Sequence, residues 1–148
     1  MSNVLIVYGS TTGNTEWVAG KLAAQIKEAG HTVESAKAGS IGASGLCSGR
    51  DLVLFGCSTW GQDEIELQDD FIPLFEAFDS IGASGVKIGV FGCGDEDYTH
   101  FCGAVDAITG KLEGLGAKLV GGKLKINGDP GDSEAAVATW GQAVLAAL

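Results

Sequence analysis

The sequence predicts a three-layer α/β protein, in which a doubly wound, five-stranded parallel sheet is covered by helices on both faces. Apolar runs alternate with amphipathic stretches along the chain, and the central runs show no polar alternation. Continuous apolar runs are typical of parallel strands that are buried on both faces. Right-handed crossovers between such strands place helices on both sides of the sheet.

Five strands are expected, at residues 4–8, 32–36, 52–56, 86–91 and 119–126, the last interrupted by Gly121 and Gly122. Between them, apolar residues recur at helical spacing in two stretches that end at Gly30 and Gly116, as suits glycine at a helix C-terminus. These residues are Val18, Leu22, Ile26 and Ala29, then Val105, Ile108, Leu112 and Leu115. A last helix follows residues 129–133 and carries Val137, Trp140, Val144 and Leu148 on one face. Trp17 and Trp140 fit these helical patterns and are expected to be packing residues.

Length and cysteine content bound the class of protein. The 148 residues predict a single domain over 1–148. We find neither a basic leader followed by an apolar segment nor a membrane span, so the chain is expected to be cytoplasmic. The four cysteines, Cys47, Cys57, Cys93 and Cys102, show no Cys-x-x-Cys spacing. They argue against a zinc or iron–sulfur site and are expected to be reduced and mostly buried.

The net charge of −10 is confined to one part of the chain. Residues 51–110 contain twelve acids and one base, whereas the remainder contains seven acids and eight bases. The acids are Asp51, Asp63, Glu64, Glu66, Asp69, Asp70, Glu76, Asp79, Asp95, Glu96, Asp97 and Asp106. Such a field repels nucleic acid and attracts basic partners. A role limited to solubility would explain a scattered excess better than a confined one.

The segment after the first expected strand suits an anion. Four hydroxyls, one amide and a glycine come in succession before a helix, at Ser10, Thr11, Thr12, Gly13, Asn14 and Thr15. Donors at a helix N-terminus favour a negatively charged group. A Walker-type loop needs a lysine, and this segment has none. The anion is therefore expected to be an anchor and not a reacting group. By composition alone, the same residues could be simple turn and N-cap residues.

The segments after the third and fourth expected strands each contain one aromatic residue among small and polar ones. Trp60 follows Cys57, and Tyr98 follows Cys93. In doubly wound sheets, ligands bind beyond the carboxyl ends of the strands where the strand order reverses. Two aromatic side chains beside an anion site predict a slot for a flat conjugated ring.

The chain resembles the short-chain flavodoxins of sulfate-reducing anaerobes over essentially its whole length. The resemblance rests on VLIVYGSTTGNTE at 4–16, GCSTWG at 56–61, ELQDDF at 66–71, and FGCGD at 91–95 through Tyr98 to FCGAVD at 101–106. It implies a flavodoxin-like fold with strand order 2-1-3-4-5 and one non-covalently bound FMN. It also implies a low-potential one-electron carrier without a substrate of its own, cycling mainly between semiquinone and hydroquinone.

The resemblance also implies a set of FMN contacts. The phosphate would lie in the segment 10–15 with help from Ser58, and the isoalloxazine between Trp60 and Tyr98. Backbone groups of Gln62, Asp95, His100 and Cys102 would read the pyrimidine edge, and Gly61 would turn its carbonyl toward the reduced flavin. The remaining contacts would be Thr59, Cys93, Gly94 and Phe101. The sequence departs from many relatives at Gln62, where they carry an acid, and His100 is also unusual.

Two rival functions fit less well. A flavin-dependent reductase of nicotinamide and quinone would need basic groups for the nicotinamide phosphates, whereas the segments here are short and acidic. A receiver-type signalling domain needs acids where Gly9 and Cys57 stand. The resemblance implies a monomer that exchanges electrons with redox proteins through basic docking surfaces, such as a hydrogenase, a 2-oxoacid oxidoreductase or a multihaem cytochrome. Neither nucleic acid nor a membrane is expected as a partner.

Overall fold

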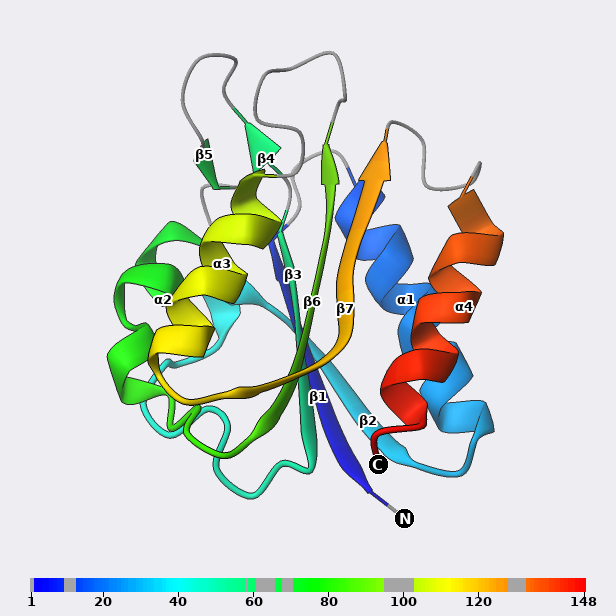
Figure 1. Cartoon of the computed structure of the whole chain (residues 1–148), viewed down its shortest axis with the longest axis horizontal. Coiled ribbons are helices and arrows are strands. Elements are labelled where there is room, and N and C mark those ends of the chain that lie inside the picture. The colour runs from blue at the N-terminus through cyan, green and yellow to red at the C-terminus, as the bar shows by residue number, and fades with distance from the viewer. Residues whose placement is uncertain are drawn as a thin grey trace.

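The computed structural model describes residues 2–9, 13–57, 59–60, 66–67, 71–94, 103–127 and 133–148. Within them, five parallel strands form one sheet in the order β2-β1-β3-β6-β7 (Figure 1). The strands are β1 (Asn3–Gly9), β2 (Thr32–Lys37), β3 (Leu52–Cys57), β6 (Lys87–Gly94) and β7 (Lys118–Asn127). Taken in chain order, these are strands 2-1-3-4-5 of the sheet, so the predicted fold class is confirmed.

Helices cover both faces of the sheet. α1 (Asn14–Glu28) and α4 (Glu134–Leu145) lie on one face, and α2 (Ile72–Glu76) and α3 (Gly103–Gly114) lie on the other (Figure 1). Two short 3-10 helices, η1 (Ala38–Ser40) and η2 (Phe78–Ser80), complete the helical elements of the described residues. An antiparallel pair, β4 (Thr59–Trp60) and β5 (Glu66–Leu67), stands apart from the main sheet.

The core consists of two clusters, one on each face of the sheet. Side chains alternate along β1, so Val4 and Ile6 join the cluster under α1 and α4, whereas Leu5 and Val7 join the one under α2 and α3. All six residues of β3 are buried. This burial explains why the central strands appear in the sequence as continuous apolar runs.

Glycine ends α1 and α3 as predicted. Gly30 has φ +92°, and the amide of His31 donates to the carbonyl of Ile26 at 3.3 Å. Gly116 has φ +85°, and the amide of Ala117 donates to the carbonyl of Leu112 at 3.1 Å. Both ends are Schellman motifs, in which a left-handed residue allows the last carbonyls to be paired.

Three predicted helix positions are wrong. Leu115 lies one residue beyond Gly114, the last residue of α3, although it still packs against the core under α2 and α3. Ala29 is exposed at the C-cap of α1 and not part of its buried face, because the chain already turns there toward β2. Leu148 lies beyond Leu145, the last residue of α4, although it still packs against the core under α1 and α4.

The strand β7 is continuous, whereas the sequence predicted an interruption at Gly121 and Gly122. Ile88 pairs with Leu119 and Val90 pairs with Lys123, so β7 carries two extra residues at this point. Gly121 and Gly122 have φ +75° and +73°, which glycine adopts without steric cost. The two glycines therefore form a β-bulge within the strand.

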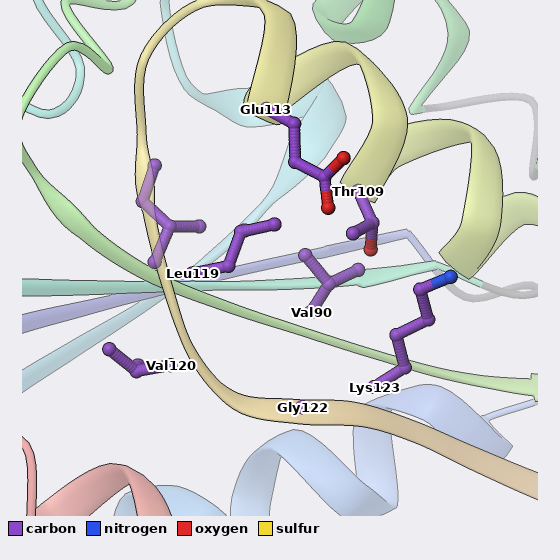
Figure 2. Close-up of a pocket in the computed structure, with 8 residues that line it drawn as sticks. Val90, Thr109, Glu113, Leu119, Val120, Gly122 and Lys123 are labelled. Atoms are coloured by element: carbon purple, nitrogen blue, oxygen red, sulfur yellow. The ribbon is translucent and has the colours of Figure 1, made fainter.

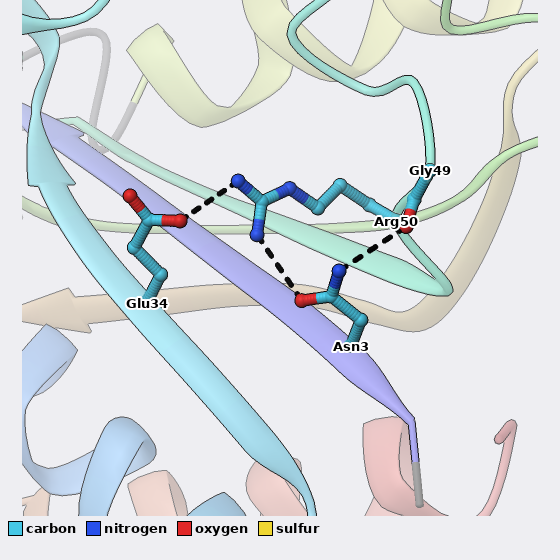
Figure 3. A network of polar contacts seen from close by, with 4 residues as sticks. All are labelled: Asn3, Glu34, Gly49 and Arg50. Atoms are coloured by element: carbon cyan, nitrogen blue, oxygen red, sulfur yellow. Dashed lines mark hydrogen bonds and ion pairs between the residues drawn. The ribbon is translucent and has the colours of Figure 1, made fainter.

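Arg50 links the exposed edge strand β2 to β1 by hydrogen bonds. Its guanidinium donates to Glu34 Oε2 at 2.8 Å and to Asn3 Oδ1 at 3.1 Å (Figure 3). The Asn3 amide in turn donates to the carbonyl of Gly49 at 3.2 Å. This network joins β1, β2 and the segment before β3, opposite the edge where the strands end.

The predicted packing roles of Trp17 and Trp140 are confirmed. Trp140 is 5 % exposed, contacts the ring of Phe91 and donates its indole N–H to the carbonyl of Gly122 at 3.0 Å. Trp17 is partly buried against the same cluster, and the ammonium of Lys21 lies 5.3 Å from its ring centre. Among the described helices, none combines the length and the apolar character needed to cross a membrane.

Candidate functional site

The segments that the sequence assigns to a ligand begin at one edge of the sheet. β1 ends at Gly9, its partner in β3 is Cys57, and β6 ends next to them at Gly94 (Figure 1). The chain places β2 on one side of β1 and β3 on the other, so the strand order reverses between β1 and β3. This edge is the position at which doubly wound sheets bind their ligands.

The first turn of α1 reaches the same edge. Gly13 is its N-cap and has φ +91°, a conformation that favours glycine, and its carbonyl accepts from the amide of Trp17 at 2.9 Å. Asn14 and Thr15 are the first residues of the helix. The first amides of a helix have no partner within it, and they carry the positive end of the helix dipole. This arrangement fits a phosphate group.

Thr15 lies deeper than the sequence suggested. Its side chain is fully buried, and it makes a hydrogen bond with the thiol of Cys93 near the end of β6. Burial raises the pKa of Cys93 to about 11, although the hydrogen bond from Thr15 opposes that effect. The contact fixes the start of α1 against the end of β6, and both segments belong to the predicted site.

Two glycines allow the strand ends to approach one another. A Cβ at Gly92 would collide with the backbone carbonyl oxygen of Cys57, and one at Gly56 would collide with the ring of Phe91. Neither glycine was among the predicted site residues. The signal that could have found them is glycine within apolar runs that otherwise consist of bulky residues.

The pair β4–β5 was also missed. Thr59 pairs with Leu67 and Trp60 pairs with Glu66, so this hairpin brackets Gly61 and Gln62 in the sequence. Strands of two residues are too short to show periodicity, and therefore no pattern could have predicted them.

The pKa values of Tyr8 and Asp106 are shifted in opposite directions by their neighbours. Burial and the nearby Glu16 carboxylate raise the pKa of Tyr8, whose hydroxyl donates to Glu16 Oε1 at 3.4 Å. Asp106, in the first turn of α3, accepts from Lys123 at 2.9 Å and from Lys125 at 2.8 Å. Partial burial raises its pKa, but these two lysines outweigh that effect, and its pKa lies below the usual value. Asp106 therefore does not add to the uncompensated negative charge of the middle segment.

The structure covers part of the predicted site. Gly13, Asn14, Thr15 and Cys93 are described with their surroundings, and the backbones of Thr59, Trp60 and Gly94 are placed in strands. Other predicted contacts lie outside the described residues, namely Ser10, Thr11, Thr12, Ser58, Gly61, Gln62, Asp95, Tyr98, His100, Phe101 and Cys102.

Comparison with known proteins identifies the family. The family model for flavodoxin matches residues 6–140. A flavodoxin of Nitratidesulfovibrio vulgaris (strain Miyazaki F) is 60% identical over 148 residues, which are 100% of both chains. Among solved structures, oxidised flavodoxin 1 from Bacillus cereus superposes with a TM-score of 0.90 at 29% identity and covers 99% of both chains.

A second solved structure adds the redox state of a relative. The solution structure of two-electron reduced Megasphaera elsdenii flavodoxin matches with a TM-score of 0.78 at 31% identity, over 95% of this chain and 97% of that one. The resemblance seen in the sequence is thereby confirmed. With its fold, its strand-order reversal and its full-length similarity, the chain belongs to the flavodoxin family, whose members are FMN-binding electron carriers and not enzymes.

Proposed function

We propose that the chain holds one FMN non-covalently at the carboxyl edge of the sheet and carries single electrons at low potential, cycling mainly between semiquinone and hydroquinone. The observation that carries this proposal is the position of three strand ends. The ends of β1, β3 and β6 are adjacent where the strand order reverses, and each is followed by a motif of the family. The full-length identity of 60% to a flavodoxin supports it.

The phosphate of FMN is assigned to the N-terminus of α1. Gly13 allows the entry of the chain into the helix, and the first amides of the helix provide donors for an anion. We assign Ser10, Thr11, Thr12, Asn14, Thr15 and Ser58 to the same group. The burial of Thr15 against Cys93 gives this residue a second role, since it also holds α1 in position.

The flavin ring is assigned to the space between Trp60 and Tyr98. Backbone groups of Gln62, Asp95, His100 and Cys102 would contact its pyrimidine edge, and Thr59, Cys93, Gly94 and Phe101 would complete the contacts. Gly61 would offer its carbonyl to a reduced ring, since glycine changes backbone conformation with little strain. Gln62 makes the local field less negative than an acid would. The flavin potentials of this chain are therefore expected to differ from those of relatives that carry an acid at this position.

The acids of the middle segment would lower the potential of the last electron. This reduction places a negative charge on the flavin, and like charges oppose it. A unit charge about 10 Å away at an effective dielectric of about 20 costs on the order of 1.5 kcal/mol before screening. Several screened charges would lower the potential by roughly 100 to 200 mV, at about 59 mV per 1.4 kcal/mol. The acids concerned are Asp63, Glu64, Glu66, Asp69, Asp70, Asp95, Glu96 and Asp97.

The same acids would attract redox partners. We propose a single-domain, cytoplasmic monomer that exchanges electrons with proteins whose docking surfaces are basic. A hydrogenase, a 2-oxoacid oxidoreductase and a multihaem cytochrome are the candidates. Complementary charge raises the rate of encounter more than it raises the affinity.

Flavin binding is tested by reconstitution. The purified protein is expected to be yellow, and its flavin-free form is expected to bind one equivalent of added FMN. Spectroelectrochemistry should then show two one-electron steps, with a blue intermediate and the second step at the more negative potential. A flavin-free protein that does not bind added FMN would overturn the proposal.

The role of the acids is tested with charge variants. Neutralising Asp95, Glu96 and Asp97 to Asn, Gln and Asn should raise the second potential by tens of millivolts. The matched control replaces Glu28, Asp79 and Glu113 in the same way, since these acids lie at the far ends of α1 and α3 and in η2. Equal shifts of the second potential in both triple variants would show that it depends on the net charge of the protein and not on the position of the acids.

A further inference from the structure

Asp106, in the first turn of α3, is held by two lysines of the edge strand β7. Its Oδ1 accepts from the ammonium of Lys123 at 2.9 Å, and its Oδ2 accepts from that of Lys125 at 2.8 Å. Figure 2 shows the side chain of Lys123 pointing from β7 toward α3, on the far side of Thr109 from Glu113. Both lysines lie on the same face of the strand, since they are two residues apart. We call Asp106, Lys123 and Lys125 the α3 clamp.

The α3 clamp is a small network and not an isolated surface pair. The side chains are 44%, 30% and 41% exposed at Lys123, Lys125 and Asp106, so water screens each contact. Together, however, the two lysines keep the pKa of Asp106 below its usual value, although partial burial raises it. One carboxylate that pairs with two cations holds its geometry better than a single exposed pair does. The clamp therefore fixes the first turn of α3 relative to β7.

The clamped turn lies near the carboxyl edge of the sheet. Lys125 pairs with Gly92, two residues before β6 ends at Gly94. On the other side of the turn, Val105 packs so closely that a Cβ at Gly92 would collide with its Cγ2 atom. α3 is also a neighbour of the hairpin strands β4 and β5, and its first turn is the end that lies toward them (Figure 1). The start of α3 thus lies among β6, β7 and this hairpin.

We propose that the α3 clamp is a positioning element for the flavin ring, an inference that rests on the proposed function. β4 carries Trp60, and Phe101 and Cys102 directly precede α3 in the sequence. All three are among the proposed ring contacts, so the first turn of α3 adjoins two of the segments to which the ring is assigned. Without the clamp this turn is free to shift, and the ring contacts have to be ordered when the flavin binds. Ordering on binding lowers the affinity.

The clamp is tested by titrating the flavin-free full-length chain with FMN and measuring the quenching of flavin fluorescence. Asp106→Asn and the double variant Lys123→Gln/Lys125→Gln should each raise the dissociation constant about threefold. The triple variant should bind no more weakly than the double variant, because the same interaction is already lost. Lys123→Arg/Lys125→Arg, which retains both cations, should keep the native affinity. Glu34→Gln, which alters the ion pair of Glu34 with Arg50, is the matched control and should change nothing.

A long-range effect of charge on the phosphate predicts a different pattern. Removing the charge of Asp106 would then strengthen FMN binding, whereas removing the charges of the two lysines would weaken it. Riboflavin lacks the phosphate and is uncharged, so its affinity should fall in both variants if the clamp positions the ring, and in neither if only charge acts. The visible circular dichroism of bound FMN should also change in both variants and not in Glu34→Gln.

Three results would overturn the positioning role. They are opposite changes of FMN affinity in the Asp106 and lysine variants, native FMN affinity in both, and a riboflavin affinity that neither variant changes. A native chain that binds no FMN would be a different result, because it would overturn the proposed function and this inference with it.

Discussion

Single residues at the carboxyl edge, beside the proposed flavin site, pack the elements of the protein against one another. Thr15 combines full burial with a hydrogen bond to Cys93, and Gly92 provides room for the carbonyl of Cys57. Each of these contacts joins two elements that lead into the proposed flavin site. A substitution at such a residue is therefore expected to affect both stability and cofactor affinity.

The three described cysteines are expected to be unreactive in the native protein. Cys47, Cys57 and Cys93 are buried, and burial raises the pKa of Cys47 and of Cys93 to about 11. At pH 9 such a thiol is about 1 % thiolate, and access to it is also restricted. Alkylation at pH 8.5, followed by peptide mass spectrometry, should be on the order of 100-fold slower than in urea. Equal rates would contradict the burial of these thiols.

At the scale of elements, glycine has opposite effects in a helix and at its end. Gly20 in α1 and Gly110 in α3 are exposed, and a Cβ at either would meet no atom within 4 Å. Gly30, in contrast, has φ +92° at the turn after α1. The same substitution is therefore expected to change stability in different directions at these positions.

Gly20→Ala and Gly110→Ala should each raise the free energy of unfolding by about 0.5–1 kcal/mol, because alanine favours the helical conformation. Gly30→Ala should lower it by about 1 kcal/mol, because alanine is strained at positive φ. Urea denaturation followed by circular dichroism measures all three. A stabilising Gly30→Ala would contradict the Schellman end of α1.

The link between α3 and β7 is electrostatic and therefore depends on pH. Lys123 and Lys125 keep the pKa of Asp106 below its usual value despite partial burial. A carboxyl group with a lowered folded-state pKa stabilises the protein above its unfolded pKa of about 3.9, and that stabilisation is lost as the pH falls through the folded pKa.

Asp106→Asn should accordingly lower the urea midpoint at pH 7, and the difference from the native chain should shrink below about pH 4. Asp106 is 41% exposed, so a small effect is expected at pH 7. The control is Glu113→Gln on the same helix, since Glu113 has no ion pair among the described residues. A difference that persists at pH 3 would mean that packing and not charge causes it.

At the scale of the whole molecule, the distribution of charge bears on both the potential of the proposed flavin and the docking of partners. The net charge is −10, and its excess lies between residues 51 and 110, which include most of the proposed flavin contacts. The basic residues Lys123 and Lys125 compensate Asp106 locally. The remaining acids would give the site a field that repels electrons and attracts basic proteins.

Electron transfer to a basic cytochrome should therefore slow as salt is added. Between about 10 mM and 500 mM salt, stopped-flow measurements should show a decrease on the order of tenfold in the second-order rate constant. A small uncharged quinone serves as the control acceptor, and its rate should change little. A rate with the cytochrome that does not depend on salt would contradict docking by the acidic segment.

Much of the fold follows from local patterns. The uninterrupted apolar run of β3 and the glycines after α1 and α3 are signals within a few residues, and the structure confirms them. The prediction that β7 is interrupted at Gly121 and Gly122 was wrong for a physical reason. Glycine disfavours a regular strand, but a bulge can accommodate it without ending the pairing with β6. The position of the site follows from the strand order, which the resemblance implied.

The sequence by itself determined the five strands of the main sheet, the helices α1, α3 and α4 and the family, because periodicity, helix caps and motifs are properties of neighbouring residues. It also predicted the edge of the sheet where a ligand would bind. Only the tertiary structure decided which distant residues meet. The hydrogen bond between Thr15 and Cys93 and the two lysines on Asp106 both depend on how helices pack against the sheet. Register and approach between distant elements, which no local pattern encodes, set these contacts.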